Sequence, residues 1–168
     1  MELTWREFWL MVHLGLGIVF IHSFGVSVKE LATGKVSRWL NVSTVAIAMV
    51  CWLTVITGTY GVYAWYRAVP PAGADLAFYP RSYLLAEAHL SHWHKFGMEW
   101  KEHVGWLTPI LATAVAYMSI KYRDVLNQHR AMRKMVLSFL TVAFLSAAIA
   151  GGLGAFINKV APNAFLDM

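Results

Sequence analysis

The chain has 168 residues, of which 58% are hydrophobic and only 14% are charged, and its mean hydropathy is +0.52. Soluble domains carry about 25% charged residues, so these values exclude an ordinary soluble domain and indicate a membrane protein. The formal net charge is +5. We do not expect a nucleic-acid partner, because the excess basic residues lie in loops beside apolar segments, as is typical of membrane proteins.

Four stretches of the chain are apolar enough to cross a lipid bilayer as helices, which takes about 20 residues each. The sequence predicts an all-α fold, a polytopic four-transmembrane-helix bundle that forms a single domain over residues 1–168. We expect its helices at about residues 8–28, 40–66, 82–122 and 135–157.

The third predicted helix is exceptionally long. At about 1.5 Å per residue it would extend on the order of 60 Å, twice the hydrocarbon thickness, so its first half should protrude from the membrane or lie along its surface. Ser82 is a candidate N-cap, and Pro109 should kink the apolar half by freeing the carbonyl of Gly105. The preceding segment, 67–80, holds three of the five prolines and cannot form a regular helix.

The distribution of basic residues predicts the topology. Eight basic residues lie in the first and third predicted loops, whereas basic and acidic residues are mixed at the other end of the helices. The positive-inside rule makes the basic loops cytoplasmic, so both termini and the Pro-rich loop should face the periplasmic, outer side of an energy-transducing inner membrane. The eight residues are Lys29, Lys35, Arg38, Lys121, Arg123, Arg130, Arg133 and Lys134.

Residues 87–103 carry four of the seven histidines and three of the nine acidic residues, directly before an apolar stretch. Alternating steps of three and four place some of them on one stripe of a helix. Such a stripe normally faces the protein interior, so imidazoles and a carboxylate on it need a functional reason. We expect Glu99 and His92 to be the catalytic residues of an outer entrance, where they transfer protons together with His89. The residues of this stripe are His89, His92, Phe96, Glu99, His103 and Trp106.

His13 of the first predicted helix lies at a depth that matches His103 of the third. An ionisable residue within a membrane helix is a functional hypothesis by default. Bundles bind cofactors between facing helices, and haem iron accepts axial imidazoles. Glycines in the outer halves of the helices, such as Gly15, Gly58 and Gly61, would make room for a flat cofactor or allow tight helix packing. The sequence therefore predicts haem b with His13 and His103 as its axial metal ligands; without a Cys-x-x-Cys-His motif the haem is not covalently attached.

His89 and His103 are fourteen residues apart on the stripe within residues 89–106. This spacing resembles that of the paired haem-ligand histidines on one helix of the cytochrome b family, and the resemblance covers that one helix. It implies a membrane b-type cytochrome subunit and adds His89 to the candidate cofactor-binding residues.

We interpret the chain as a membrane subunit of a respiratory or photosynthetic-type electron-transfer complex. It would pass electrons between a quinone and a partner redox protein, within a complex of larger membrane or periplasmic redox subunits, and would not be a complete enzyme. Two alternatives remain open. One is an outer His/Glu site that binds copper, zinc or iron, or a quinone. The other is a non-catalytic anchor or assembly subunit.

Overall fold

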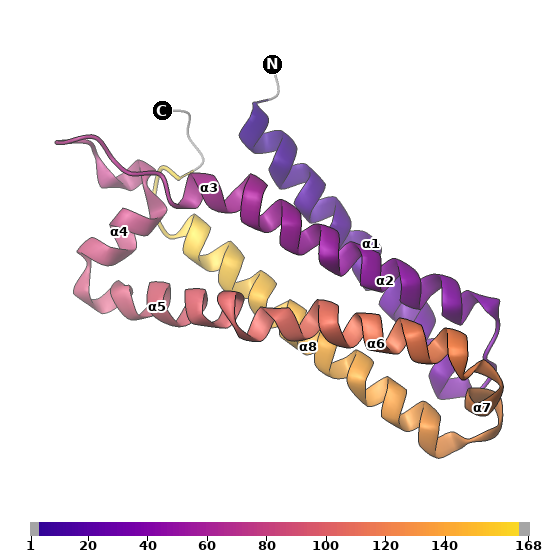
Figure 1. The fold of residues 1–168 in the computed structure, drawn as a ribbon. Coiled ribbons are helices and arrows are strands. Elements are labelled where there is room, and N and C mark those ends of the chain that lie inside the picture. Colours follow the sequence, from indigo (N-terminus) through magenta and orange to yellow (C-terminus); the bar gives the residue numbers. More distant parts are fainter. Residues whose placement is uncertain (1–3, 165–168) are drawn as a thin grey trace.

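The computed structural model describes residues 4–164, which form helices and no strand (Figure 1). The predicted all-α fold is confirmed. Four helical segments are long and apolar enough to cross a membrane, which makes this a multi-pass membrane protein by length and composition. All four extend beyond the 20 or so residues that the hydrocarbon layer requires. They are Trp5–Thr33, Arg38–Tyr66, Ala88–Lys121 and Arg130–Lys159.

The first span is a single helix, α1 (Trp5–Thr33), with clear signals at both ends. Thr4 accepts a hydrogen bond from the backbone of Glu7, and the Glu7 carboxylate accepts one from the backbone of Thr4, which is a capping box. Gly34 ends the helix with a positive φ of 73°, a conformation that glycine adopts without strain. The sequence of the first loop therefore determines where α1 turns back.

The second span changes its helical type along its length. The regular helix α2 (Arg38–Ile56) continues into a π-helical segment, η1 (Thr57–Val62), and then into the short α3 (Tyr63–Tyr66). π-helical segments are rare and frequently lie at functional sites. The segment η1 packs against the outer half of α1.

The long third helix is confirmed as a helical segment of 34 residues, Ala88–Lys121. It begins later than predicted, because Glu87 has an extended backbone (φ −96°, ψ 110°) and the chain bends there. The residues before the bend form a separate helix with Pro80 in its first turn, so the predicted N-cap at Ser82 is wrong. The elements of this part of the chain are η2 (Leu76–Phe78), α4 (Pro80–Ala86), α5 (Ala88–Glu102), η3 (Val104–Trp106) and α6 (Leu107–Lys121).

A 3-10 turn, η3, interrupts the third span directly before Pro109. Proline at this position has no N–H to donate and crowds the carbonyl four residues earlier, so the regular helical pattern fails on its N-terminal side. The hydroxyl of Ser146 donates a hydrogen bond of 3.0 Å to the carbonyl of Val104 in this turn. The interruption is thus stabilised by the neighbouring span.

The last part of the described chain comprises α7 (Arg123–Gln128) and α8 (Arg130–Lys159). Buried hydroxyls join the spans: Ser27 of α1 and Ser43 of α2 lie 2.7 Å apart, and Thr108 of α6 donates to the carbonyl of Ala143 in α8. Such hydrogen bonds hold helices together where lipid supplies no hydrophobic driving force.

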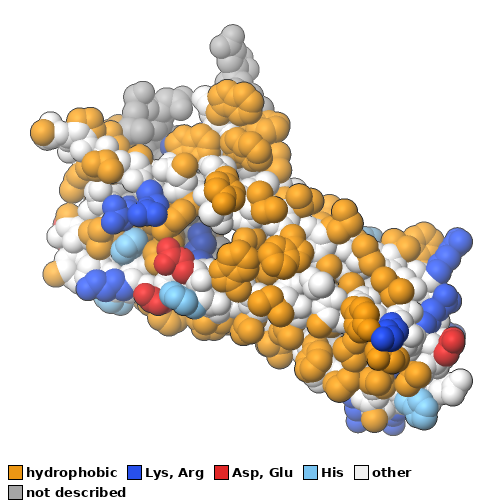
Figure 2. Space-filling model, viewed as in Figure 1, with side chains coloured by type: hydrophobic (Ala, Val, Ile, Leu, Met, Phe, Trp, Pro, Cys, Tyr) orange, Lys and Arg blue, Asp and Glu red, His pale blue; other side chains and the backbone are white. Residues whose placement is uncertain are grey.

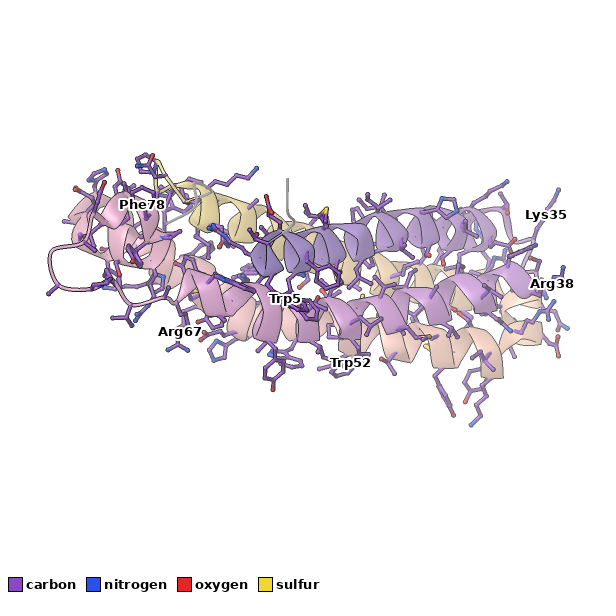
Figure 3. The ribbon with its side chains drawn as sticks, turned by 90° about the horizontal axis from the view of Figure 1, so that it is seen from above. Trp5, Lys35, Arg38, Trp52, Arg67 and Phe78 are labelled. Atoms are coloured by element: carbon purple, nitrogen blue, oxygen red, sulfur yellow. The ribbon has the colours of Figure 1, made fainter. Side chains whose placement is uncertain are left out.

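The surface is apolar along the middle of the bundle and charged at its two ends (Figure 2). Figure 3 shows Lys35 and Arg38 at one end and Arg67 and Phe78 at the other. The described part of the chain also begins and ends at one end of the bundle, because Arg6 donates a hydrogen bond to the carbonyl of Ala164. Exposed large apolar side chains on all four spans are compatible with a surrounding lipid bilayer.

Candidate functional site

The stripe predicted within residues 89–106, called the α5 stripe from here on, does not face the interior of the described part of the chain. All six of its side chains are exposed, and Phe96 retains 52% of its accessible surface. The opposite face of α5 carries the buried Gly97 and Met98 and packs against α8. The prediction that the α5 stripe points inward is therefore wrong: the apolar side chains on the other face are the ones that are buried.

The inward face of α5 brings a different histidine into the bundle. The Nδ1 atom of His94 lies 2.6 Å from the hydroxyl of Tyr66, and the two rings are stacked with their centroids 5.9 Å apart. Tyr66 is buried, with 2% of its surface accessible, and His94 is half-buried. A buried tyrosine hydroxyl needs a hydrogen-bond partner, and His94 supplies it.

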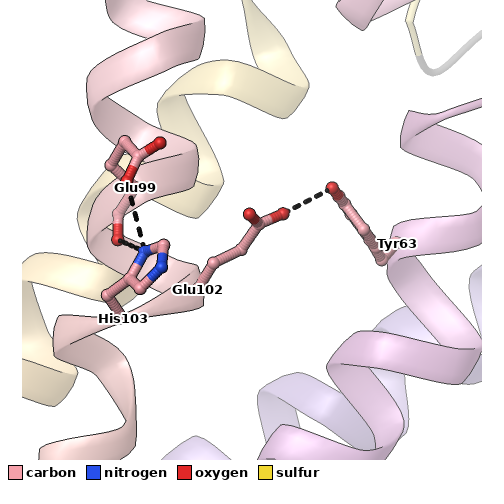
Figure 4. A network of polar contacts seen from close by, with 4 residues as sticks. All are labelled: Tyr63, Glu99, Glu102 and His103. Atoms are coloured by element: carbon pink, nitrogen blue, oxygen red, sulfur yellow. Dashed lines mark hydrogen bonds and ion pairs between the residues drawn. The ribbon is translucent and has the colours of Figure 1, made fainter.

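A second polar pair lies next to the first and is more exposed. The hydroxyl of Tyr63 donates a hydrogen bond of 3.0 Å to Glu102 Oε1 (Figure 4). The rings of Tyr63 and Tyr66 stack, with centroids 6.1 Å apart, so the two pairs are adjacent. Arg81 of α4 lies within electrostatic range of both tyrosines and of His94. We call Tyr63, Tyr66, His94 and Glu102 the outer polar cluster.

A small cavity lies beside the outer polar cluster. Its volume is about 30 Å³, and Tyr66 forms part of its wall together with the polar side chains of Arg6 and Asn158. A polar cavity of more than about 15 Å³ can hold a water molecule. The cavity is thus large enough for a water molecule beside Tyr66.

Two of the candidate glycines serve helix packing. A Cβ atom added to Gly58 would lie 3.2 Å from His13 Cε1, and one added to Gly61 would lie 3.0 Å from the ring of Trp9. Side chains of α1 therefore already occupy the space beside η1 that we predicted for a flat cofactor. At Gly15 no atom lies within 4 Å of an added Cβ, so this glycine faces open space.

His13 is half-buried between α1 and η1, where its Nδ1 atom lies 3.4 Å from Thr57 Oγ1. Lys101 of α5 is within electrostatic range of His13. The side chain of Lys101 lies beside Gly154, where an added Cβ atom would be 3.5 Å from Lys101 Nζ. An ammonium group near His13 is an unfavourable neighbour for a cationic metal centre.

His103 lies at the end of α5, and 69% of its side chain is exposed. Its Nδ1 atom is 3.2 Å from both the carbonyl oxygen and Oε2 of Glu99 (Figure 4). A metal-binding histidine commonly has one ring nitrogen held in this way, which leaves the other for the metal. The arrangement supports His103 as a metal ligand. His103 is exposed at the end of α5, however, whereas His13, the second predicted ligand, is half-buried against η1.

The other candidates on the α5 stripe do not converge on one centre. His89 Nδ1 is 3.8 Å from Glu87 Oε2 at the start of α5, and the ring of His92 contacts Trp93. Within residues 4–164 no three histidine, cysteine or acidic side chains lie close enough together to hold a metal ion.

Sequence reasoning missed the outer polar cluster as a unit. One sequence signal was available: His94 lies four residues before Met98 and seven before Lys101, and therefore on the same face of α5 as the buried Met98.

Comparisons of the chain with protein-family models, with curated proteins and with solved structures find no match.

Proposed function

We propose that this protein is a membrane subunit of an electron-transfer complex whose outer polar cluster exchanges protons with a quinone. The observation that carries the proposal is the 2.6 Å contact between His94 Nδ1 and the hydroxyl of Tyr66, a residue that also lines a cavity with room for water. Imidazole exchanges protons readily near neutral pH, and a tyrosine hydroxyl can relay them. Ionisable residues on membrane helices that pair with one another are characteristic of proton pathways.

The two pairs of the cluster would have different roles. Tyr63 and Glu102 form the exposed pair and would exchange protons with the outer solvent, whereas Tyr66 and His94 form the deeper pair. A quinone takes up protons together with electrons when it is reduced and releases both when it is oxidised. The electrons would pass to or from a partner redox subunit, and this chain would bind and orient the quinone and move its protons.

Binding of a soluble quinone analogue tests the proposal. We would titrate the detergent-purified full chain with decylubiquinone and decyl-menaquinone analogues and follow tryptophan fluorescence. We expect Tyr66→Phe and His94→Phe each to weaken binding about tenfold or more, because loss of a hydrogen-bond partner in a buried site costs about 1–3 kcal/mol. Tyr60→Phe is the matched control, since Tyr60 lies on the same π-helical segment but is 80% exposed. Equal affinities in all variants, or no quenching by any quinone, would contradict the proposal.

Haem b bound by His103 is a second candidate. The Glu99 contacts of its Nδ1 atom favour it, because they orient the ring and leave Nε2 for iron. A haem shared by His13 and His103 is not favoured, because the side chains of His13 and Trp9 fill the positions next to Gly58 and Gly61 where the haem would need space. When bound, the haem would supply one-electron transfer, and Glu99 would hold the His103 ring.

A dithionite-reduced minus oxidised absorption spectrum tests the haem candidate. We expect an α-band of b-type haem in the purified complex. The band should be lost in His103→Ala and retained in His129→Ala, because His129 is an exposed residue directly before the beginning of α8. Full haem content in His103→Ala would refute this ligand. A chain that binds neither haem nor quinone would instead be a non-catalytic anchor.

A further inference from the structure

The most basic end of the bundle holds a second pocket, far from the outer polar cluster. Its volume is about 170 Å³, and it opens where the end of α1 meets the beginning of α8. Figure 2 shows Lys and Arg side chains gathered at this end of the molecule. The lining residues are Leu31, Ala32, Arg130, Arg133, Lys134 and Leu137.

Three cationic side chains converge on this pocket. Arg133 and Lys134 lie three and four residues after Arg130 on α8, so both neighbour Arg130 on the helix surface. Between residues 4 and 164 the ion pairs within 4.0 Å all lie at the other end of the bundle, at Glu87 and Glu99. Cations that share a pocket repel one another unless an anion lies between them.

The three cations differ in what they do within the protein. Arg133 Nη1 donates to the carbonyls of Leu126 and Asn127, and its guanidinium lies against Gly34. Arg133 therefore joins the end of α1 to the end of α7 and has a structural role. Arg130 and Lys134 are exposed at the rim of the pocket, where their charged groups can bind an external anion.

The floor of the pocket is apolar and leads toward the lipid. Leu31 is buried and Leu137 is half-buried, and Leu137 lies seven residues, or about 10 Å, further along α8 than Arg130. Two turns further along the same side of α8 lie the half-buried Phe144 and the exposed Leu145. A ligand that fits this pocket has an anionic head and an apolar tail.

We propose that this pocket binds the phosphate of an anionic phospholipid, with Arg130 and Lys134 as the ligands of the headgroup. Basic pockets between membrane helices on the cytoplasmic side hold such headgroups. Arginine contributes paired hydrogen bonds to phosphate and lysine contributes a compact charge. The first part of the acyl chain lies along Leu137. The site is independent of the function proposed for the outer polar cluster.

Lipid binding to the full chain in detergent tests the proposal by native mass spectrometry. The probes are dioctanoyl phosphatidylglycerol, dioctanoyl phosphatidylcholine and inorganic phosphate. We expect Arg130→Gln with Lys134→Gln to weaken phosphatidylglycerol binding about 25-fold, since each basic residue near a membrane surface contributes roughly fivefold. The matched control is Lys35→Gln with Arg38→Gln, which removes the same charge from the same end of the bundle at residues that do not line the pocket. The control should change the affinity less than twofold.

Three results would overturn the proposal. An equal loss in the pocket variant and the control would mean that only diffuse surface charge attracts the lipid. Equal binding of phosphatidylcholine would mean that the anionic charge is not recognised. Inorganic phosphate that binds as tightly as phosphatidylglycerol would identify the ligand as free phosphate. If the double variant does not fold, Arg130→Gln alone should weaken binding roughly fivefold, and unchanged binding would equally refute the site.

Discussion

At the scale of single residues, glycine in this bundle serves close approach between helices. Gly58 and Gly61 lie one above the other on η1, and the side chains of His13 and Trp9 pack directly onto their backbone. Cβ atoms would be too close to these rings for ordinary van der Waals contact. Glycine at these two positions therefore allows α1 to lie against the π-helical segment, and so determines where His13 sits.

Gly61→Ala should destabilise the protein by about 1–3 kcal/mol, because the added methyl group overpacks the contact with Trp9. The measurement is the free energy of unfolding in mixed micelles during a titration with sodium dodecyl sulfate. Gly17→Ala is the control, since no atom lies within 4 Å of its added Cβ. It should be neutral or slightly stabilising, because alanine favours helix more than glycine. A Gly61 variant as stable as the Gly17 variant would contradict the packing role.

At the scale of elements, the third span depends on its neighbour. Its regular pattern is interrupted at η3, and an interrupted helix leaves carbonyl groups without their usual partners. Ser146 of α8 donates to the carbonyl of Val104 in this turn. Within a membrane a carbonyl finds no water, and the Val104 carbonyl accepts hydrogen bonds from both Ser146 and the backbone N–H of Leu107.

Ser146→Ala should lower the free energy of unfolding by about 1 kcal/mol, because it removes the hydrogen bond between α8 and the Val104 carbonyl, which then keeps only the backbone N–H of Leu107 as a donor. The matched control is Ser138→Ala on the same helix, where the exposed hydroxyl bonds only to the carbonyl of Lys134 in its own helix. Its effect should stay within about 0.5 kcal/mol. The same titration compares the two variants, and equal effects would show that the contact with η3 adds no stability.

At the scale of the whole molecule, the two ends of the bundle have different chemistry. One end carries eight basic residues at the ends of its helices and in the turns between them, and the other carries the outer polar cluster with the Pro-rich segment. An even number of spans brings the beginning and end of the described chain to the same end, as the contact of Arg6 with Ala164 shows. The side of the membrane on which each end lies follows from the positive-inside rule and stays a prediction.

Cysteine labelling tests this topology. In a Cys51→Ala background, we expect a membrane-impermeant maleimide to label Ala72→Cys in intact spheroplasts and to label Asn127→Cys only after permeabilisation. Both positions are exposed, and they lie at opposite ends of the bundle. The reverse labelling pattern would put the outer polar cluster on the cytoplasmic side. Labelling of both positions from outside would contradict a third membrane span.

Composition and hydropathy alone determined that this is a multi-pass membrane protein of four helical spans, because burying apolar surface in lipid leaves little choice of secondary structure. The irregular segment before Pro80 was equally evident, since it depends on the local backbone preferences of proline.

Only the tertiary structure decided which face of α5 is buried. Periodicity showed that His89, His92 and His103 share one stripe, but a helix with an apolar and a polar stripe can present either to its neighbours. Packing against α8 buried Gly97 and Met98 and turned His94 toward Tyr66. The outer polar cluster joins residues far apart in the sequence, and the bend at Glu87 and the π-helical segment bring them together. That arrangement depends on contacts between helices, which no single stretch of sequence contains.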